Sequence, residues 1–183
     1  MNASVFRVCA VLAAMTVGCR PAERTGAAAS DSLAQSAAQY TQRFYVWYGQ
    51  HHDRMDIAIS QGAAFFSPEL IGALRADQEA SARSPDEVVG LDWDPFTASQ
   101  DQCDPYKIGQ TTRRGDTVLV AVKGMCADAA PGPDADVVAE LRRSGASWVF
   151  VNFRYPDRSG NLLADLDTLR AERDRSSAQG KQH

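Results

Sequence analysis

The chain has few lysines, histidines and cysteines, and each shortage excludes a class of function. Only three of its 19 basic residues are lysine, and no basic stripe alternates with aromatic residues, so we do not expect nucleic-acid binding. The adjacent His51 and His52 would point about 100° apart on a helix, and His183 lies in the tail, so no zinc site is expected. No phosphate-binding or hydrolase motif occurs, and no cofactor is predicted.

The sequence also has no apolar run long enough to cross a membrane. The run Val8–Val17, which follows Arg7, falls well short of the roughly 20 residues that a membrane helix needs, but it suits a signal peptide. The segment Thr16-Val17-Gly18-Cys19 resembles the lipobox of bacterial lipoproteins, although leucine is usual where Thr16 stands. We therefore predict a lipoprotein signal over residues 1–18 and diacylglycerol and palmitate on Cys19. The alternative is an ordinary secretory signal that is cut nearby.

The lipid on Cys19 would fix the location of the protein. Two or three acyl chains hold a protein at a membrane, whereas one chain anchors it only marginally. Arg20 stands where an aspartate is the common signal for inner-membrane retention, so we expect the outer membrane, with the domain facing the periplasm. Residues 19–31 are small and polar and predict a flexible tether.

The remaining cysteines predict a disulfide. Cys9 lies in the signal and Cys19 takes the lipid, so Cys103 and Cys126 are left in an oxidising compartment. A bridge closing a loop of this size would contribute roughly 3 kcal/mol. The alternative is two separate buried thiols.

Apolar periodicity predicts helices in the first half of the chain. After a cap at Asp31 or Ser32, residues 33–47 place apolar side chains three and four apart, as on one buried helical face. Residues 55–66 are predicted to be helical at first. Ser67-Pro68-Glu69 begins a further helix, with Leu70, Ile71 and Leu74 on its apolar face, which ends near residue 83.

The second half alternates with a period of two and predicts strands. Candidate strands span residues 106–112, 117–123, 136–142 and 147–155, and a closing helix spans 162–173. Short turns at Gly115 and Gly145 favour an antiparallel four-strand meander. The predicted fold class is α+β, with N-terminal helices packed on a curved sheet, a single domain over residues 32–175 and a disordered tail over 176–183.

The run LDWDPFTASQD, followed by VLVAVKG and WVFVNFRYP, resembles the bacterial DUF3828 family over about residues 40–169. These are small exported or lipid-anchored proteins of unknown function. The resemblance implies a cone-like fold related to the NTF2-like superfamily, in which a curved sheet can enclose a cavity. It supplies no catalytic residues and no general counterpart of the cysteine pair.

The acidic cluster Asp92, Asp94, Asp101 and Asp104 could supply oxygen ligands to a cation, but its spacing does not complete a calcium loop. We favour a structural joint, in which the carboxylates accept hydrogen bonds from nearby backbone donors while Trp93 and Phe96 pack on the core. Strict alternation would place Trp148, Phe150, Asn152 and Arg154 on one face of the last strand, where they could line a ligand cavity. The simpler interpretation is a strand running from core to rim.

These features favour a binding protein over an enzyme. The predicted partner is another envelope protein or a small ligand. One alternative is an NTF2-like cavity enzyme with Asp92, Asp101 or Tyr106 as its base. Another is an immunity-type inhibitor of a toxin, which the acidic charge and the expected location fit.

Overall fold

The computed structural model describes residues 22–52, 54–84, 89–99, 104–125, 135–157 and 160–180, with side chains from residue 31 to residue 179. The elements in chain order are α1 (Ala22–Gln50), α2 (Met55–Ser60), the 3-10 helix η1 (Ala63–Phe65), α3 (Pro68–Arg83), β1 (Tyr106–Arg114), β2 (Thr117–Gly124), β3 (Val137–Ser144), β4 (Ser147–Arg154) and α4 (Leu162–Gly180). The strands form one antiparallel sheet in the order β1-β2-β3-β4. The predicted α+β meander with a closing helix is therefore confirmed.

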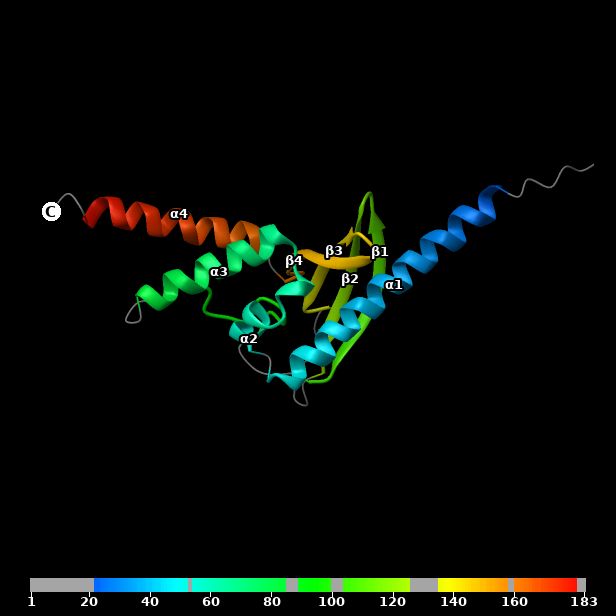
Figure 1. The fold of residues 1–183 in the computed structure, drawn as a ribbon, viewed down its shortest axis with the longest axis horizontal. Helices are drawn as coiled ribbons and strands as arrows, with labels where there is room; N and C mark the ends of the chain where they lie inside the picture. Colours follow the sequence, from blue (N-terminus) through cyan, green and yellow to red (C-terminus); the bar gives the residue numbers. More distant parts are fainter. Residues whose placement is uncertain are drawn as a thin grey trace, which may run out of the picture.

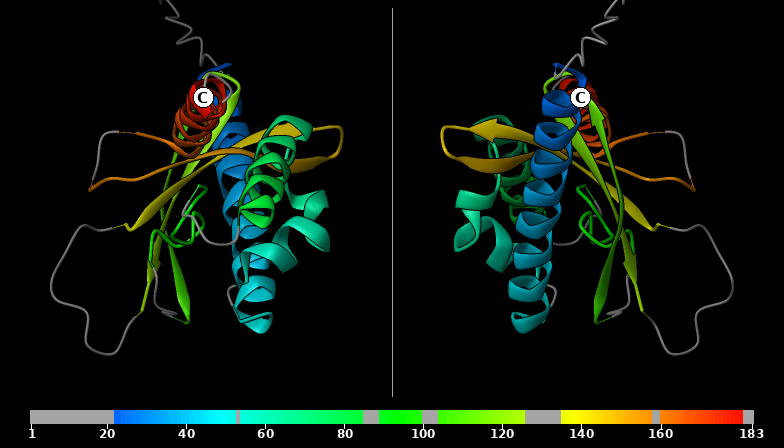
Figure 2. Two further views of the ribbon diagram at one scale, coloured as in Figure 1. Left: turned by 90° about the vertical axis from the view of Figure 1, so that its left-hand side faces the viewer. Right: turned by 90° about the vertical axis from the view of Figure 1, so that its right-hand side faces the viewer.

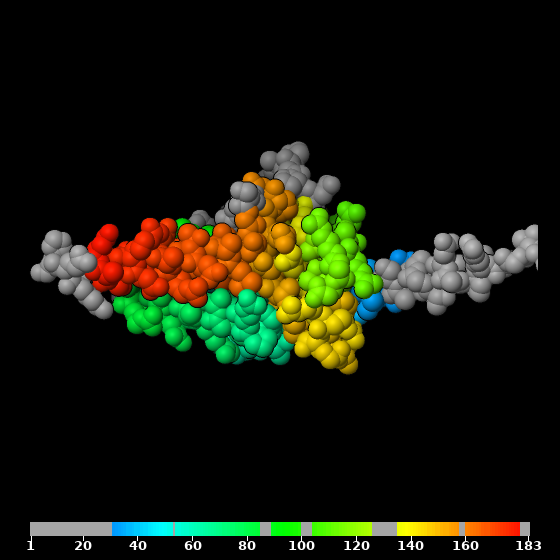
Figure 3. All heavy atoms as spheres, turned by 90° about the horizontal axis from the view of Figure 1, so that it is seen from above, coloured from blue at the N-terminus to red at the C-terminus, as the bar shows by residue number. Residues whose placement is uncertain are grey.

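The helices cover one face of the sheet and its β4 edge. α1 crosses the face formed by β1 and β2, and its N-terminal part projects beyond the sheet (Figure 1; Figure 2). α3 and α4 lie side by side and extend away from the sheet at the other end of the molecule (Figure 1; Figure 3). In the described part of the chain, no helix is both long enough and apolar enough to span a bilayer.

α1 begins nine residues before the predicted cap at Asp31, at Ala22. Residues 22–30 were expected to belong to the tether, but they are rich in alanine, which has the highest helix propensity. The predicted apolar face is present, since Ala37, Tyr40 and Phe44 are buried. α4 likewise continues to Gly180, into the tail that was expected to be disordered.

α3 begins as its sequence predicts. The hydroxyl of Ser67 accepts a hydrogen bond from the backbone N–H of Leu70 at 3.2 Å, and Pro68 occupies the first turn. The backbone N–H of Ser67 donates to the carbonyl of Phe150 at 2.8 Å, which ties the start of the helix to β4. This contact covers part of the outer edge of β4.

Two glycines allow the tight hairpins of the sheet. Gly115 joins β1 to β2 with φ of +62°, and Gly145 joins β3 to β4 with φ of +59°. Both values lie in the left-handed region that favours glycine. Because β2 pairs with β3, both hairpin turns lie toward the same end of the sheet.

A bulge in β4 corrects the predicted alternation. Glu140 pairs with Asn152 while the next residue, Leu141, pairs with Phe150, so Val151 is an extra residue. The bulge turns Phe153 to the same side as Phe150, and their ring centroids lie 5.2 Å apart. Asn152 therefore does not share a face with Phe150, and the shared face that strict alternation predicted for Phe150 and Asn152 is wrong.

Aromatic side chains fill the space between the sheet and α1. Phe44 is fully buried, and the rings of Tyr48, Phe66, Phe96 and Phe150 surround it at centroid distances of 5.0 to 5.6 Å. Aromatic pairs at these separations gain energy beyond their buried area. The centre of the fold is thus a packed aromatic core.

Candidate functional site

The segment Asp94–Ser99 forms a closed turn between the helices and the sheet. The Asp94 N–H donates to the Ser99 carbonyl at 3.1 Å, and the Ala98 N–H donates to the Asp94 carbonyl at 2.9 Å. The Asp94 carboxylate also accepts the Phe96 N–H at 2.8 Å. An aspartate that accepts its own backbone two residues later is a standard turn former.

Tyrosine hydroxyls hold this turn from both sides. From α1, Tyr45 donates to the Phe96 carbonyl at 2.5 Å, and Tyr48 donates to the Asp94 carboxylate at 2.7 Å. Because Phe96 is fully buried, these bonds satisfy polar groups beside the core. The carboxylate of Asp94 is thus engaged by the fold itself.

From the end of β4, Tyr155 completes the support. Its hydroxyl donates to the Pro95 carbonyl at 3.1 Å, and its ring packs edge-on against Trp93 at a centroid distance of 4.8 Å. Trp93 is only partly buried. The segment therefore links α1 to β4 in the manner expected of a joint.

The other residues proposed for a pocket lie elsewhere. Asp92 is exposed beside a small open hollow of about 240 Å³ whose wall includes Asp165 of α4. Tyr106 is buried at the start of β1, with its ring centroid 5.1 Å from that of Tyr45. Asp101 lies outside the described residues. The structure does not bring these candidate bases into one cavity.

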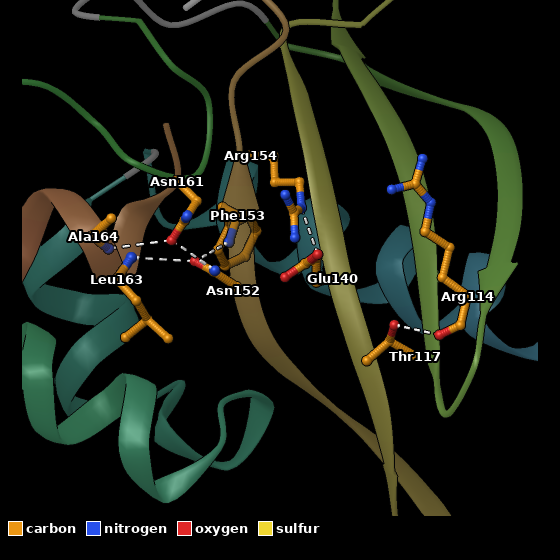
Figure 4. Close-up of polar contacts among 9 residues, drawn as sticks. All are labelled: Arg114, Thr117, Glu140, Asn152, Phe153, Arg154, Asn161, Leu163 and Ala164. Carbon is orange, nitrogen blue, oxygen red and sulfur yellow. Dashed lines mark hydrogen bonds and ion pairs between the residues drawn. The ribbon is translucent and has the colours of Figure 1, made fainter. Parts of the chain in front are cut away.

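Asn152 and Arg154 lie on the face of the sheet opposite α1. Figure 4 shows Asn152 reaching the start of α4, where its side-chain oxygen accepts the Leu163 N–H at 3.2 Å and its amide donates to Asn161 at 2.8 Å. Arg154 forms an ion pair with Glu140 of β3 at 2.5 Å. Asn152 thus caps a helix, and Arg154 crosses between strands.

We call the face opposite α1 the outer face. It consists of the strand residues that alternate with the buried Val118, Val120 and Val122 of β2, together with their cross-strand partners. Among the described residues no helix lies across this face. Its members on the four strands are Lys107, Thr112, Arg114, Thr117, Leu119, Ala121, Lys123, Val138, Glu140, Arg142, Val149, Asn152 and Arg154.

Sequence reasoning proposed Asn152 and Arg154 but missed the rest of this face as a candidate site. A signal was present, since two arginines stand near the turn in both hairpins: Arg113-Arg114 at the end of β1, and Arg142-Arg143 before Ser144, the last residue of β3. Alternation then places one arginine of each pair on the outer face. The sequence analysis concentrated on the carboxylates of the acidic cluster instead.

A second surface feature is the open hollow between α3 and α4. It measures about 670 Å³, and its wall includes Ala80, Leu169 and Arg173. Arg173 donates to the buried carboxylate of Asp77 at 2.6 Å and to the Val89 carbonyl at 2.7 Å. These contacts join the two helices, so Arg173 stabilises the fold.

Two further expectations from the sequence concern the cysteines and a metal site. Cys19, Cys103 and Cys126 all lie outside the described residues, so the lipidation and the disulfide stay predictions. Within the described ranges, histidine, cysteine, aspartate and glutamate do not gather in threes or more that could hold a metal ion.

Comparisons with known proteins give one similar structure. No family model matches the chain, so the resemblance to DUF3828 stays a prediction, and no curated protein matches it. A chain of the type VI native effector–immunity complex Tae3–Tai3 from Ralstonia pickettii is 22% identical. The match covers 66% of this chain and 95% of that one, with a TM-score of 0.45.

Proposed function

We propose that this protein is a lipid-anchored, periplasm-facing envelope protein whose domain binds another protein and carries out no reaction. The location rests on the signal and on Cys19 in the sequence. The binding role rests on the aromatic core and on the outer face. A separate observation supports each half of the proposal, so each half needs a separate test.

The filled core is the observation that carries the binding role. An NTF2-like enzyme would need a space between sheet and helices that admits a substrate and an acidic or phenolic base. Here Phe44, Phe96 and Phe150 occupy that space and are fully buried. Side chains that pack at such distances leave no room for a ligand without displacing the core.

The outer face, unlike the filled core, offers a surface on which a partner can bind. It carries exposed arginines, threonines and buried or half-buried aliphatic side chains on one sheet, and arginine is enriched in protein interfaces. A small ligand is usually held in a concave pocket, whereas a sheet face presents a broad surface. A protein is therefore the partner that this geometry fits best.

The anchoring half is tested at Cys19. We expect wild-type protein to incorporate a fatty-acid analogue and to be released from membranes only by detergent. Cys19→Ser should lose the label and accumulate as precursor, whereas Cys9→Ser should behave as wild type. Normal processing of Cys19→Ser, with no label on wild type, would refute the anchor.

The binding half is tested with photo-crosslinking amino acids in the full chain in its own envelope. One is placed at Thr112 on the outer face, and a control is placed at Glu79 on α3; both positions are exposed. We expect a discrete protein adduct from Thr112, identified by mass spectrometry. An effector toxin is one partner class to score, because toxin inhibition is among the alternatives that the sequence leaves open. No protein adduct from either position would contradict the proposed function.

A further inference from the structure

We infer that the outer face recognises a carboxylate-bearing surface of its protein partner, and that Arg114 and Arg142 bind those carboxylates. This inference rests on the proposed function and names the chemistry of the partner. It begins with the register of the sheet. Arg114 pairs with Thr117, and Thr117 pairs with Arg142, so the three residues form one row across β1, β2 and β3.

The row places two guanidinium groups within reach of one acidic surface. Neighbouring strands lie about 4.8 Å apart, so the Cα atoms of Arg114 and Arg142 are roughly 10 Å apart. Both side chains are exposed. Thr117 lies between them, and its hydroxyl donates to the Arg114 carbonyl at 2.8 Å (Figure 4). Its side chain is much shorter than the two arginine side chains beside it. Two arginines in this arrangement can each form paired hydrogen bonds with a carboxylate.

Glu140, Arg154 and Lys123 of the outer face are each paired with an oppositely charged residue. Glu140 pairs with Arg154 at 2.5 Å, and Asp136 pairs with Lys123 at 2.6 Å. For Arg114 and Arg142, the described residues provide no acidic partner within ion-pair distance. The chain as a whole carries a net charge of −4, so exposed, unpaired cations on this face run against its overall composition.

The surroundings of the arginines fit a protein better than a lipid or nucleic-acid surface. Val149, which is half-buried, pairs with Arg142, and the buried Leu119 lies two residues along β2 from Thr117 on the same face, so apolar side chains adjoin the row. Glu140 lies one row away, where its carboxylate is already paired with Arg154. Arginines beside apolar side chains and a carboxylate match the mixed composition of a protein interface.

The β3–β4 hairpin, which carries Arg142, is held in place at its tip. Arg143 stacks over the ring of Trp148, with its guanidinium carbon 5.4 Å from the ring centroid, and Trp148 donates to Ser36 of α1 at 3.0 Å. The β3–β4 hairpin is thus fixed to α1 at its tip. A fixed hairpin lets Arg142 bind without ordering a loose segment, which lowers the entropic cost of association.

The test compares crosslinking from Thr112 in two variants of equal charge. Arg114→Ser with Arg142→Ser removes the row, and Arg170→Ser with Arg175→Ser removes two exposed arginines from α4. We expect the first pair to reduce the protein adduct about tenfold, the size of one lost charged anchor, and the α4 pair to leave it unchanged. Raising the salt from about 50 mM to about 500 mM should reduce the wild-type adduct as well, since exposed charges are screened.

Each other outcome contradicts a defined statement. An adduct that both variant pairs form equally would refute the role of the arginines and leave the binding function intact. An adduct from Glu79 alone would refute the assignment of the outer face as the binding surface. An adduct with lipid in place of protein would refute the partner class, and no adduct would refute the proposed function itself. Arg114→Lys with Arg142→Lys, which keeps the charge but loses the paired geometry, should restore only part of the yield.

Discussion

Arg173 of α4 forms an ion pair with Asp77 of α3, with 2.6 Å between Nη1 and Oδ1, and the carboxylate is almost fully buried. The other oxygen of Asp77 accepts the Leu91 N–H at 2.9 Å. Gly90 makes this approach possible, because a Cβ there would lie 2.8 Å from Asp77 Oδ2 and 2.2 Å from Ser81 Oγ. One carboxylate thereby joins α3, α4 and the chain that follows α3.

We predict that Asp77→Ala destabilises the domain by about 3–5 kcal/mol, because it leaves a largely buried guanidinium and the Leu91 N–H without an acceptor. The matched control is Asp167→Ala, which breaks an exposed pair with Arg170 on the same helix and should cost about 1 kcal/mol or less. Urea unfolding followed by tryptophan fluorescence measures both. Equal losses in the two variants would contradict a structural role for Asp77.

We predict that ionisation of Tyr40 destabilises the folded domain at alkaline pH. Burial raises the pKa of Tyr40 to about 12, although the nearby Arg43 guanidinium lowers it in part. The folded state therefore holds the phenol proton more tightly than the unfolded state, whose pKa is near 10. The contribution is present below pH 10 and is lost as the pH rises toward 12.

Tyr40→Phe tests this assignment. The variant lacks the ionisable group and the 3.2 Å hydrogen bond to the Phe65 carbonyl, so it should be somewhat less stable at neutral pH. Its stability should then fall less steeply than that of wild type between pH 10 and pH 12. Parallel curves for the two proteins over that interval would contradict the raised pKa.

The disulfide prediction gains support from the residues next to the cysteines. The Met125 N–H donates to the Pro105 carbonyl at 3.0 Å, and Tyr106 pairs with Gly124. Cys103 precedes Pro105 by two residues, and Cys126 directly follows Met125. A crosslink there would close the open end of the β1–β2 hairpin.

We predict that peptide mapping of mature protein without reduction finds Cys103 linked to Cys126. Replacing both with serine should lower the stability by roughly 3 kcal/mol, the entropic effect of a loop of this length. Alkylation of both thiols in unreduced protein from the envelope would contradict the bridge.

Local signals explain which parts of the fold were predictable. Ser67 and Pro68 act through the first turn of α3 alone, and the glycines at 115 and 145 act within two-residue turns, so their roles follow from the sequence. The start of α1 was missed because a small, polar composition resembles a tether, although its alanines favour helix.

Features that depend on distant contacts were not predictable. The bulge at Val151 leaves no mark in a strand whose residues are nearly all compatible with β-structure, and it changes the face of every later residue. Asn152 could not be recognised as a helix cap, because its partners, Asn161 just before α4 and Leu163 in the first turn of α4, lie nine and eleven residues away. The outer face was missed because pairing across three strands brings Arg114 and Arg142 into one row.

The joint at residues 94–99 gives the last prediction, since its two central residues act through different forces. Phe96 is fully buried, and its ring lies 5.2 to 5.6 Å from the rings of Phe44, Phe66 and Phe153. Removing a buried aromatic ring costs about 3–5 kcal/mol, so Phe96→Ala should lower the melting temperature strongly. In Asp94→Asn the remaining oxygen can still accept the Phe96 N–H, and the amide nitrogen can donate to the Tyr48 hydroxyl in place of the bond that is lost, so the change should cost nearer 1 kcal/mol.

The same pair of variants distinguishes a joint from a cation site. If the Asp94 carboxylate serves only the turn and Tyr48, added calcium or zinc should leave the melting curves of wild type and Asp94→Asn unmoved. Trp93→Ala should fall between the two variants, because Trp93 is only partly buried against Tyr155. A rise in the wild-type melting temperature with calcium that disappears in Asp94→Asn would make this turn a cation site, because a ligand stabilises only the state that binds it.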